Sequence, residues 1–273
     1  MPISCLPVSL FPQILSKELP LEEWATECKR IGLDGFDVSM MFVENHTPAY
    51  LHNLRERLEK VGLPIVMACD YPDFSHPDAV QRDRELDYLR RDIAVCSELG
   101  VKYLRVLAGQ AHPGLAREDG VKRAVQGLRA AADAADRYGV QLVYEDHAKP
   151  GAWDYIDFSF PPDIFLEIVD ALRDTSVGVN FDTGNITAAG WETMPVLEKI
   201  ADRIKTVHVS DTSAFGKFDP VLIGEGATPN REIFHYLKSR GFDGWLCIEE
   251  ASNTGMDGVR KAVAYTQKLW REA

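Results

Sequence analysis

The sequence predicts a single (β/α)8 barrel, the TIM-barrel architecture, spanning residues 1–273 as one domain. One unit recurs along the chain: a segment with apolar residues at helical spacing, a glycine, and a short apolar strand. Eight such units can be counted, and strands that alternate with helices imply parallel pairing. With 273 residues and 45% hydrophobic content, the chain can bury the core of such a barrel. A doubly wound open sheet is the alternative, but no G-x-G-x-x-G motif follows the first strand.

The first half of the chain shows the repeating unit most clearly. Leu21, Trp24 and Cys28 recur at helical spacing. Gly32 follows them as a C-terminal cap. Three more helical segments end at a glycine in the same way, and an apolar strand follows each. We expect strands at 3–8, 35–39, 64–68, 103–107 and 142–145, with helices at 21–31, 51–61, 86–96 and 121–135.

The second half continues the alternation after a longer loop. Pro162 and Asp163 can start the helix that follows this loop, because proline is favoured in a first helical turn. No linker, charge block or low-complexity segment divides the chain. We expect the remaining strands at 177–182, 204–208 and 245–249, and helices at 162–172, 193–201, 230–240 and 256–270.

Charge and cysteine content narrow the classes of function. The formal net charge of −12 disfavours nucleic-acid binding, which relies on clustered Lys and Arg. The five cysteines contain no C-x-x-C pair, which is typical of reduced thiols rather than a secreted disulfide framework. No apolar run reaches the roughly 18 residues of a membrane span. Residues 1–15 lack the positive start of a signal peptide. We therefore expect a cytoplasmic protein.

Four predicted strands in the second half end in a residue that can bind a metal. Each of these residues follows an apolar or β-branched run: Glu145, Asp182, His208 and Glu249. The strands are the fifth to eighth of the count, and the sites of such barrels lie at the C-terminal mouth of the strands. Because adjacent strands lie about 4.8 Å apart, successive strand ends can direct their side chains at one point. The sequence therefore predicts a metal site.

A structural interpretation of each residue also exists. A single acid after a strand is usually a loop residue or a helix N-cap, and a lone histidine beside an apolar strand is usually a core residue. Four such residues on successive strands are harder to explain by chance. The oxygen-rich set with one imidazole favours a divalent cation, Mn²⁺ first, with Mg²⁺, Co²⁺ or Zn²⁺ as alternatives, whereas a structural zinc site would favour cysteine.

Glu145 and Glu249 have a second predicted role, as catalytic acid and base. They would flank the ion, so a chelated substrate would present opposite faces to two carboxylates. One could remove a proton beside a carbonyl and the other could return it on the opposite face, through an enediolate that the metal stabilises. Epimerisation would follow. If one carboxylate handles both transfers between neighbouring carbons, the result is aldose–ketose isomerisation.

Short segments around these residues carry a resemblance to a known family. The segments are Asp182-Thr183-Gly184-Asn185, His208-Val209-Ser210-Asp211, Gly224-Glu225-Gly226 and Gly241-Phe242-Asp243-Gly244-Trp245, together with Glu145 and Glu249. They resemble the sugar phosphate isomerase/epimerase family, the xylose isomerase-like TIM barrels, over essentially the whole chain. The resemblance implies that Glu145, Asp182, His208 and Glu249 are metal ligands and that Glu145 and Glu249 are the acid/base pair.

The resemblance does not name a substrate. The superfamily includes ketose 3-epimerases, inosose-type isomerases and dehydratases, hydroxypyruvate isomerase and type IV apurinic endonucleases. The endonucleases and the ketose 3-epimerases carry a histidine three residues after the aspartate of the sixth strand, where this chain has Asn185. The epimerases also carry an arginine six residues after the histidine of the seventh strand, where this chain has Ala214. These departures argue against DNA repair. They also mean that the resemblance does not imply a free-ketohexose 3-epimerase.

Further residues are candidates for the wall of a substrate pocket. Each has an ordinary alternative as a turn cap, a surface residue or part of the barrel–helix packing, and Asp211 could instead orient His208. The candidates for substrate binding are His147, His112, Asn185, Asp211, Glu225, Trp153 and Lys149.

The expected function is that of a divalent-metal-dependent sugar isomerase or epimerase acting on a keto-sugar or inosose-like substrate. An inosose-type dehydratase using the same metal site is the first alternative. A non-catalytic sugar-binding subunit and a metal-dependent apurinic endonuclease are alternatives of other classes. The expected partner is a small sugar or polyol-derived molecule, without nucleic acid or membrane, and the sequence is compatible with a homo-oligomer.

Overall fold

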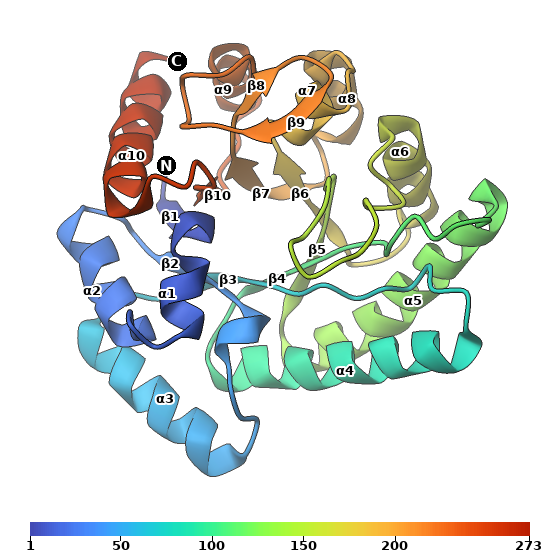
Figure 1. Ribbon diagram of the computed structural model, residues 1–273, viewed down its shortest axis with the longest axis horizontal. Helices are drawn as coiled ribbons and strands as arrows, with labels where there is room; N and C mark the ends of the chain where they lie inside the picture. Colours follow the sequence, from blue (N-terminus) through green and yellow to red (C-terminus); the bar gives the residue numbers. More distant parts are fainter.

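Eight parallel strands form a nearly closed barrel surrounded by helices in the computed structural model, which describes residues 1–273 (Figure 1). The hydrogen-bonded order is β1-β10-β7-β6-β5-β4-β3-β2. Between the ends of this order, the N–H of Asp34 donates to the carbonyl of Ile3 at 2.9 Å, and Ser4 Oγ donates to Asp37 Oδ2 at 2.6 Å. The barrel strands are β1 Ile3–Leu6, β2 Phe36–Ser39, β3 Ile65–Cys69, β4 Tyr103–Val106, β5 Gln141–Glu145, β6 Gly178–Asp182, β7 Ile204–Val209 and β10 Trp245–Glu249.

The helices alternate with these strands, as the sequence predicts, and two short ones lie at the mouth. Acidic residues begin α2 and basic residues end it, which suits the helix dipole. Asp78 caps α4 by accepting a hydrogen bond from the N–H of Val80 at 2.9 Å. The helices are α1 Phe11–Leu15, α2 Leu21–Arg30, α3 Pro48–Val61, α4 Ala79–Glu98, α5 Arg117–Tyr138, α6 Pro162–Ala171, α7 Asn185–Ala188, α8 Thr193–Ile200, α9 Asn230–Ser239 and α10 Gly255–Glu272, with 3-10 turns at Val8–Leu10 and Met40–Phe42.

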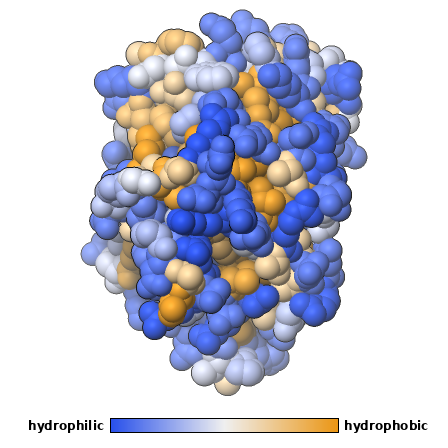
Figure 2. Space-filling view, turned by 90° about the vertical axis from the view of Figure 1, so that its right-hand side faces the viewer, coloured by the Kyte–Doolittle hydropathy of each residue, from blue (hydrophilic) through white to orange (hydrophobic).

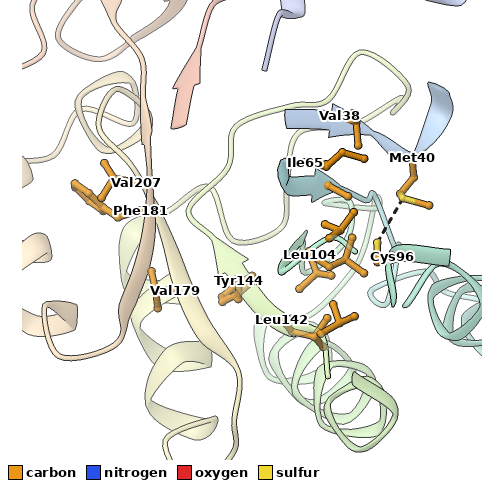
Figure 3. Packing of buried hydrophobic residues seen from close by; sticks show 14 of the residues in the cluster. Val38, Met40, Ile65, Cys96, Leu104, Leu142, Tyr144, Val179, Phe181 and Val207 are labelled. Atoms are coloured by element: carbon orange, nitrogen blue, oxygen red, sulfur yellow. Dashed lines mark hydrogen bonds between the residues drawn. The ribbon is translucent and has the colours of Figure 1, made fainter. Parts of the chain in front are cut away.

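The largest apolar cluster lies between the barrel and its helices. Alternate strand residues face outward, so Leu142 and Tyr144 of β5 both belong to this layer (Figure 3). The ring of Tyr144 lies 5.2 Å from that of Phe165 in α6. In the part of this layer next to β2, the sulfur of Met40 lies 3.8 Å from that of Cys96 in α4 (Figure 3). Each fully buried side chain of this kind contributes about 1.5–3 kcal/mol, so this layer holds the strands in place.

The alternate set of strand residues fills the barrel interior and changes in character along the axis. Met67, Val143 and Cys247 belong to a small apolar cluster inside the barrel. Two residues further along their strands, towards the mouth, the inward positions of β5 and β10 are Glu145 and Glu249. The barrel interior is therefore filled with apolar side chains away from the mouth and carries ionisable side chains at the mouth.

Three elements at the mouth were not expected from the sequence: the helices α1 and α7, and a hairpin of β8 Thr212–Ala214 and β9 Lys217–Pro220. The hairpin strands are short and mostly exposed, so they lack the apolar alternation that marks a strand. The first strand also ends at Leu6, two residues before the expected boundary.

The outer surface carries both hydrophilic and hydrophobic side chains. On the flank seen in Figure 2, hydrophilic side chains predominate and hydrophobic ones are scattered among them. All five cysteines are free and buried, in agreement with the sequence interpretation. None of the helices combines the length and the apolar character that crossing a membrane would require.

Candidate metal centre and active site

The four predicted ligands lie at the C-terminal ends of four neighbouring barrel strands. Glu145, Asp182 and Glu249 are the last residues of β5, β6 and β10, and His208 is the penultimate residue of β7. In the β6–β7 ladder, Asp182 is the direct partner of His208. Because strand residues alternate in direction, the side chains at these positions turn into the barrel mouth.

Three of the four predicted ligands gather at one point. Ligand atoms of Glu145, Asp182 and His208 lie within 4.8 Å of one another, and all three side chains are fully buried. The imidazole Nδ1 of His208 contacts Glu145 Oε1. Neither Asp182 Oδ2 nor His208 Nε2 has a hydrogen-bond partner within the chain. Because buried polar atoms are almost always paired, these unpaired atoms fit a bound cation.

Glu249 lies next to this group, at the end of β10, which pairs with β7. Its carboxyl lies beside that of Asp182, and the residue lines the same cavity as Arg105 and His147. It is not one of the three residues whose ligand atoms already converge.

The electrostatics of the group show that its acids are crowded. Burial, then the charges of Glu249 and Glu145, raise the pKa of Asp182 well above its usual range. Burial and Glu145 likewise raise the pKa of Glu249. Burial would also raise the pKa of Glu145, but His208 and Arg105 beside it lower that pKa to about 2. A divalent cation among these groups would relieve the repulsion, so the donor set fits a hard or borderline metal ion.

Hydrogen bonds from neighbouring strands hold Glu145 and Asp182 in place. Asn180 Nδ2 donates to Glu145 Oε1 at 2.6 Å, and Thr206 Oγ1 donates to Asn180 Oδ1 at 2.6 Å. Ser210 Oγ donates to Asp182 Oδ1 at 2.8 Å. The sequence interpretation missed Asn180 and Ser210. The period of two along β6 would have placed Asn180 inside the barrel, two residues before Asp182.

Arg105 is a further residue that the sequence interpretation missed. It lies on β4, is 1% exposed, and places Nε 3.1 Å from Glu145 Oε2. Its guanidinium carbon lies 4.7 Å from the ring centre of Tyr71, and Nη1 donates to the carbonyl of Asp70 at 3.1 Å. The sequence did contain a signal for Arg105, because it is a charged residue inside an otherwise apolar strand. A buried cation in this position balances one of the clustered carboxylates.

A cavity of about 540 Å³ opens in front of this group. Of the residues predicted to bind substrate, four line it: His147, Lys149, Asn185 and Asp211. His147 is 7% exposed, and its Nδ1 has no partner within the chain. Burial lowers the pKa of His147 to about 3, so the ring is neutral and free to form a hydrogen bond with a substrate.

Asn185 and Asp211 already have partners. Asn185 Nδ2 donates to the carbonyl of Asp146 at 3.0 Å, which leaves its side-chain oxygen available. Asp211 accepts hydrogen bonds from the N–H groups of Thr212, Gly224, Gly226 and Thr228. Its carboxylate therefore organises the loops after β7, rather than orienting His208.

The other three predicted pocket residues do not line this cavity. His112 Nε2 lies 2.7 Å from Asp73 Oδ2, in a separate cluster of the loops after β3 and β4. Trp153 is buried within the loop after β5, and Glu225 is exposed. Their loops are long or turn sharply, so counting residues from a strand end did not indicate where these side chains lie.

Comparison with known families agrees with the barrel fold. The model of the xylose isomerase-like TIM barrel family matches residues 25–269. The chain belongs to this family. Its curated relatives include sugar isomerases and epimerases, which supports an enzyme of that general kind.

Three similar proteins illustrate the range of this family. L-ribulose-5-phosphate 3-epimerase UlaE of Escherichia coli K12 is 25% identical over 270 residues, covering 89% of this chain and 91% of the relative. Inosose dehydratase of Bacillus licheniformis is 26% identical over 214 residues, covering 72% of this chain and 64% of the relative. The crystal structure of IOLI protein with a bound zinc atom superposes with a TM-score of 0.80 at 20% identity, covering 100% of this chain and 99% of that one. The last likeness confirms the fold.

Proposed function

We propose that the protein is a divalent-metal-dependent sugar isomerase or epimerase, which moves a proton next to the carbonyl of a keto-sugar or inosose-like substrate. The observation that carries this proposal is the convergence of Glu145, Asp182 and His208 within 4.8 Å at the mouth of the barrel. Glu249 lines the cavity beside these three residues. The similarity to an epimerase and to a dehydratase, both of which act on sugar-like molecules by name, supports the same class of substrate.

Glu145, Asp182, His208 and Glu249 are the residues that would hold the metal. When bound, a divalent ion would supply a positive charge that binds the substrate's carbonyl and neighbouring hydroxyl oxygens and stabilises the negative charge that develops on them. The set of three carboxylates and one imidazole suits Mn²⁺, and also Mg²⁺, Co²⁺ or Zn²⁺.

Glu145 and Glu249 are the proposed acid/base pair. They lie on β5 and β10, and β6 and β7 separate these two strands in the sheet. A substrate seated between them would present opposite faces to the two carboxylates. One carboxylate takes the proton from the carbon beside the carbonyl, and the other delivers a proton to the opposite face, which gives an epimer. A single carboxylate acting on two neighbouring carbons would give an isomer instead.

The residues around the pair have defined tasks in this proposal. Arg105 and Asn180 orient Glu145 and favour its ionised form, so that it can accept a proton. The neutral ring of His147 and the free side-chain oxygen of Asn185 are placed to form hydrogen bonds with substrate hydroxyls. These contacts would set which carbon lies opposite the base.

Solvent deuterium exchange tests the acid/base role. Glu145→Gln and Glu249→Gln should each abolish NMR-detected deuterium incorporation beside the carbonyl, across a screen of keto sugars and inososes. Glu56→Gln, which changes a carboxylate exposed on α3, is the matched control and should leave incorporation unchanged. Far-UV circular dichroism would show that all three variants fold. Undiminished exchange in both site variants would rule out the proposed pair.

Dehydration is the second candidate, because a curated relative is an inosose dehydratase. The same screen separates it, since the product would have lost water by mass. A non-catalytic sugar-binding role predicts binding without turnover and without dependence on metal. Cleavage of an abasic DNA duplex would instead support a nuclease, which the net charge of −12 disfavours.

A further inference from the structure

The part of the cavity wall that carries His147 is a long loop with little burial at its outer end. The loop spans residues 146–161, between β5 and α6, and His147 and residues 149–152 line the cavity. Residues 154–156 of the loop are exposed. Exposed segments gain little from the hydrophobic effect, so hydrogen bonds to neighbouring segments fix their position. For this loop, Gln110 supplies them.

One end of the Gln110 side-chain amide holds the loop. Gln110 lies in the loop after β4. Its Oε1 accepts hydrogen bonds from the N–H groups of Asp154 at 2.9 Å and Tyr155 at 3.0 Å. Gln110 and Asp157 also form an isolated antiparallel bridge. The side chain and the backbone of Gln110 therefore both bind the returning arm of the loop.

The bridge connects Gln110 to the residues that line the cavity. The N–H of Asp157 donates to the carbonyl of Ala148 at 2.7 Å, which ties the two arms of the loop together. Ala148 lies between His147 and Lys149, and both of these residues line the cavity. A shift of Asp157 would therefore move His147.

The other end of the amide is held by Asp73, in the loop after β3. Gln110 Nε2 donates to Asp73 Oδ2 and the backbone N–H of Gln110 donates to Asp73 Oδ1, both at 3.0 Å. Asp73 is 5% exposed, and Ser75 Oγ also donates to its Oδ1 at 3.0 Å. A carboxylate only accepts hydrogen bonds and backbone N–H groups only donate them, so the side chain between them needs one donor and one acceptor. Glutamine meets both needs, whereas glutamate would set a second carboxylate against Asp73.

We propose that Gln110 positions the loop between β5 and α6 at the substrate cavity. Its amide fixes Asp154 and Tyr155 to the loop after β3, and its bridge to Asp157 carries this restraint to His147. Gln110 does not itself line the cavity, so it acts on the substrate only through the loop. The inference rests on the proposed function for the identity of this cavity as the substrate site.

Two complementary substitutions test this inference. Gln110→Glu keeps the acceptor for the loop but loses the donor, and it places two carboxylates within hydrogen-bond distance of each other. Adding Asp73→Asn supplies the missing donor from the other side. His112 Nε2, which lies 2.7 Å from Asp73 Oδ2, can accept the second N–H of the new amide in its other tautomer. The double variant therefore restores the hydrogen bonds with donor and acceptor exchanged.

Hydrogen exchange followed by mass spectrometry on the Mn²⁺-loaded protein measures the loop. The amides of residues 148–157 should exchange about tenfold faster in Gln110→Glu and return to within about threefold of the wild type in the double variant. Gln126→Glu changes an amide exposed on α5 and is the matched control, which should leave exchange unchanged. Unchanged exchange in Gln110→Glu, or a double variant no better protected than the single one, would overturn the inference.

The kinetics of deuterium incorporation separate positioning from folding. The probes are D-ribulose and scyllo-inosose, a ketopentose and an inosose. Because His147 is placed to bind substrate hydroxyls and not the transferred proton, Gln110→Glu should raise KM about tenfold and change kcat less. The double variant should recover the KM of the wild type. A loosened loop with an unchanged KM would also overturn the inference.

A chemical probe keeps this inference distinct from the proposed function. If the wild-type protein exchanges a proton of neither probe, nor of any sugar in the deuterium screen, the proposed function fails. Carbethoxylation of His147 by diethyl pyrocarbonate then decides the inference, because the unpaired Nδ1 of this 7% exposed residue reacts faster when the loop opens. Faster labelling in Gln110→Glu that the double variant reverses would support the role of Gln110. Equal labelling in all three proteins would overturn it.

Discussion

At the scale of single residues, the site depends on a buried ion pair that lies beside the proposed ligands. Arg105 and Glu145 are 1% and 0% exposed, and their closest atoms are 3.1 Å apart. Removing one member of a buried pair leaves the other charge without compensation in a medium of low polarity. The pair therefore links the stability of the barrel mouth to the ionisation of the proposed base.

Arg105→Met should lower the free energy of unfolding by about 3 kcal/mol, because Glu145 would remain buried without its cation. Urea denaturation would measure the loss. Arg55→Met is the control, since Arg55 is 49% exposed and pairs with an exposed Glu59, and its effect should stay within about 0.5 kcal/mol. Equal stability of the two variants would contradict this account of Arg105.

At the scale of elements, α5 holds the loop that borders the substrate cavity. A Cβ at Gly120 would lie 2.2 Å from the ring of Phe158, which belongs to the loop between β5 and α6. The N–H of Phe158 donates to the carbonyl of Gly109 at 2.8 Å. Residues 149–152 of the same loop line the cavity. The missing side chain of Gly120 therefore lets α5, the loop after β4 and the cavity wall pack together.

Gly120→Ala should destabilise the protein by about 1–3 kcal/mol, although the same change normally favours a helix by about 1 kcal/mol. The cause is the clash with Phe158, which must move with its loop. A double-mutant cycle with Phe158→Leu, followed by urea denaturation, would measure the coupling. Additive effects of the two changes would show that this contact does not limit packing.

At the scale of the whole molecule, metal binding and buried acids both affect stability. The proposed ligands come from four strands, so a metal would tie together β5, β6, β7 and β10. A ligand that binds only the folded state stabilises it by RT times the logarithm of one plus the ratio of the free ligand concentration to the dissociation constant. Removing the metal should therefore loosen the same half of the barrel that carries the chemistry.

Chelation should lower the melting temperature of the metal-loaded protein, measured by differential scanning calorimetry. At free metal about 100 times the dissociation constant, the expected stabilisation is about 2.7 kcal/mol. Asp182→Asn should abolish this metal-dependent shift. Asp257→Asn, at a position 80% exposed on α10, should retain it. A shift that survives in Asp182→Asn would place the metal elsewhere.

A second pair of acids predicts a dependence of stability on pH. Burial, then the nearby Asp92, raise the pKa of Asp70 to about 8, and burial raises that of Asp92 to about 6. His46 Nδ1 lies 3.7 Å from Asp92 Oδ1 and is the nearest cationic partner when protonated. Both folded-state pKa values lie above the usual value of 3.8, so the folded state holds these protons more tightly. Their contribution to stability is present below about pH 4 and is lost as pH rises through 6 and 8.

Asp92→Asn should therefore raise the free energy of unfolding at pH 8 relative to the wild type, and this gain should vanish towards pH 4. Urea denaturation between pH 4 and 8 would measure it. Asp87→Asn, at a position 66% exposed on the same helix, should change little at any pH. A gain in Asp92→Asn that is constant with pH would contradict the sign of these pKa shifts.

Much of the fold and part of the site could be predicted from local patterns. The alternation of apolar strands with helices ending at glycine placed all eight barrel strands, because burial requires a repeating pattern of apolar residues. The same count placed Glu145, Asp182, His208 and Glu249 at the ends of neighbouring strands, which the structure confirms. These features depend on neighbours in sequence or on a regular architecture, so the sequence by itself determined them.

The tertiary structure alone decided the features that depend on contacts between distant segments. The pairing of Arg105 with Glu145, the placement of His112 beside Asp73 and the lining of the cavity join residues from different units of the barrel. The β8–β9 hairpin carries no apolar period, because it lies over the mouth and not in the core. A residue's spacing along the chain determines the face of the element on which it lies, whereas its partner depends on how the loops fold over the barrel.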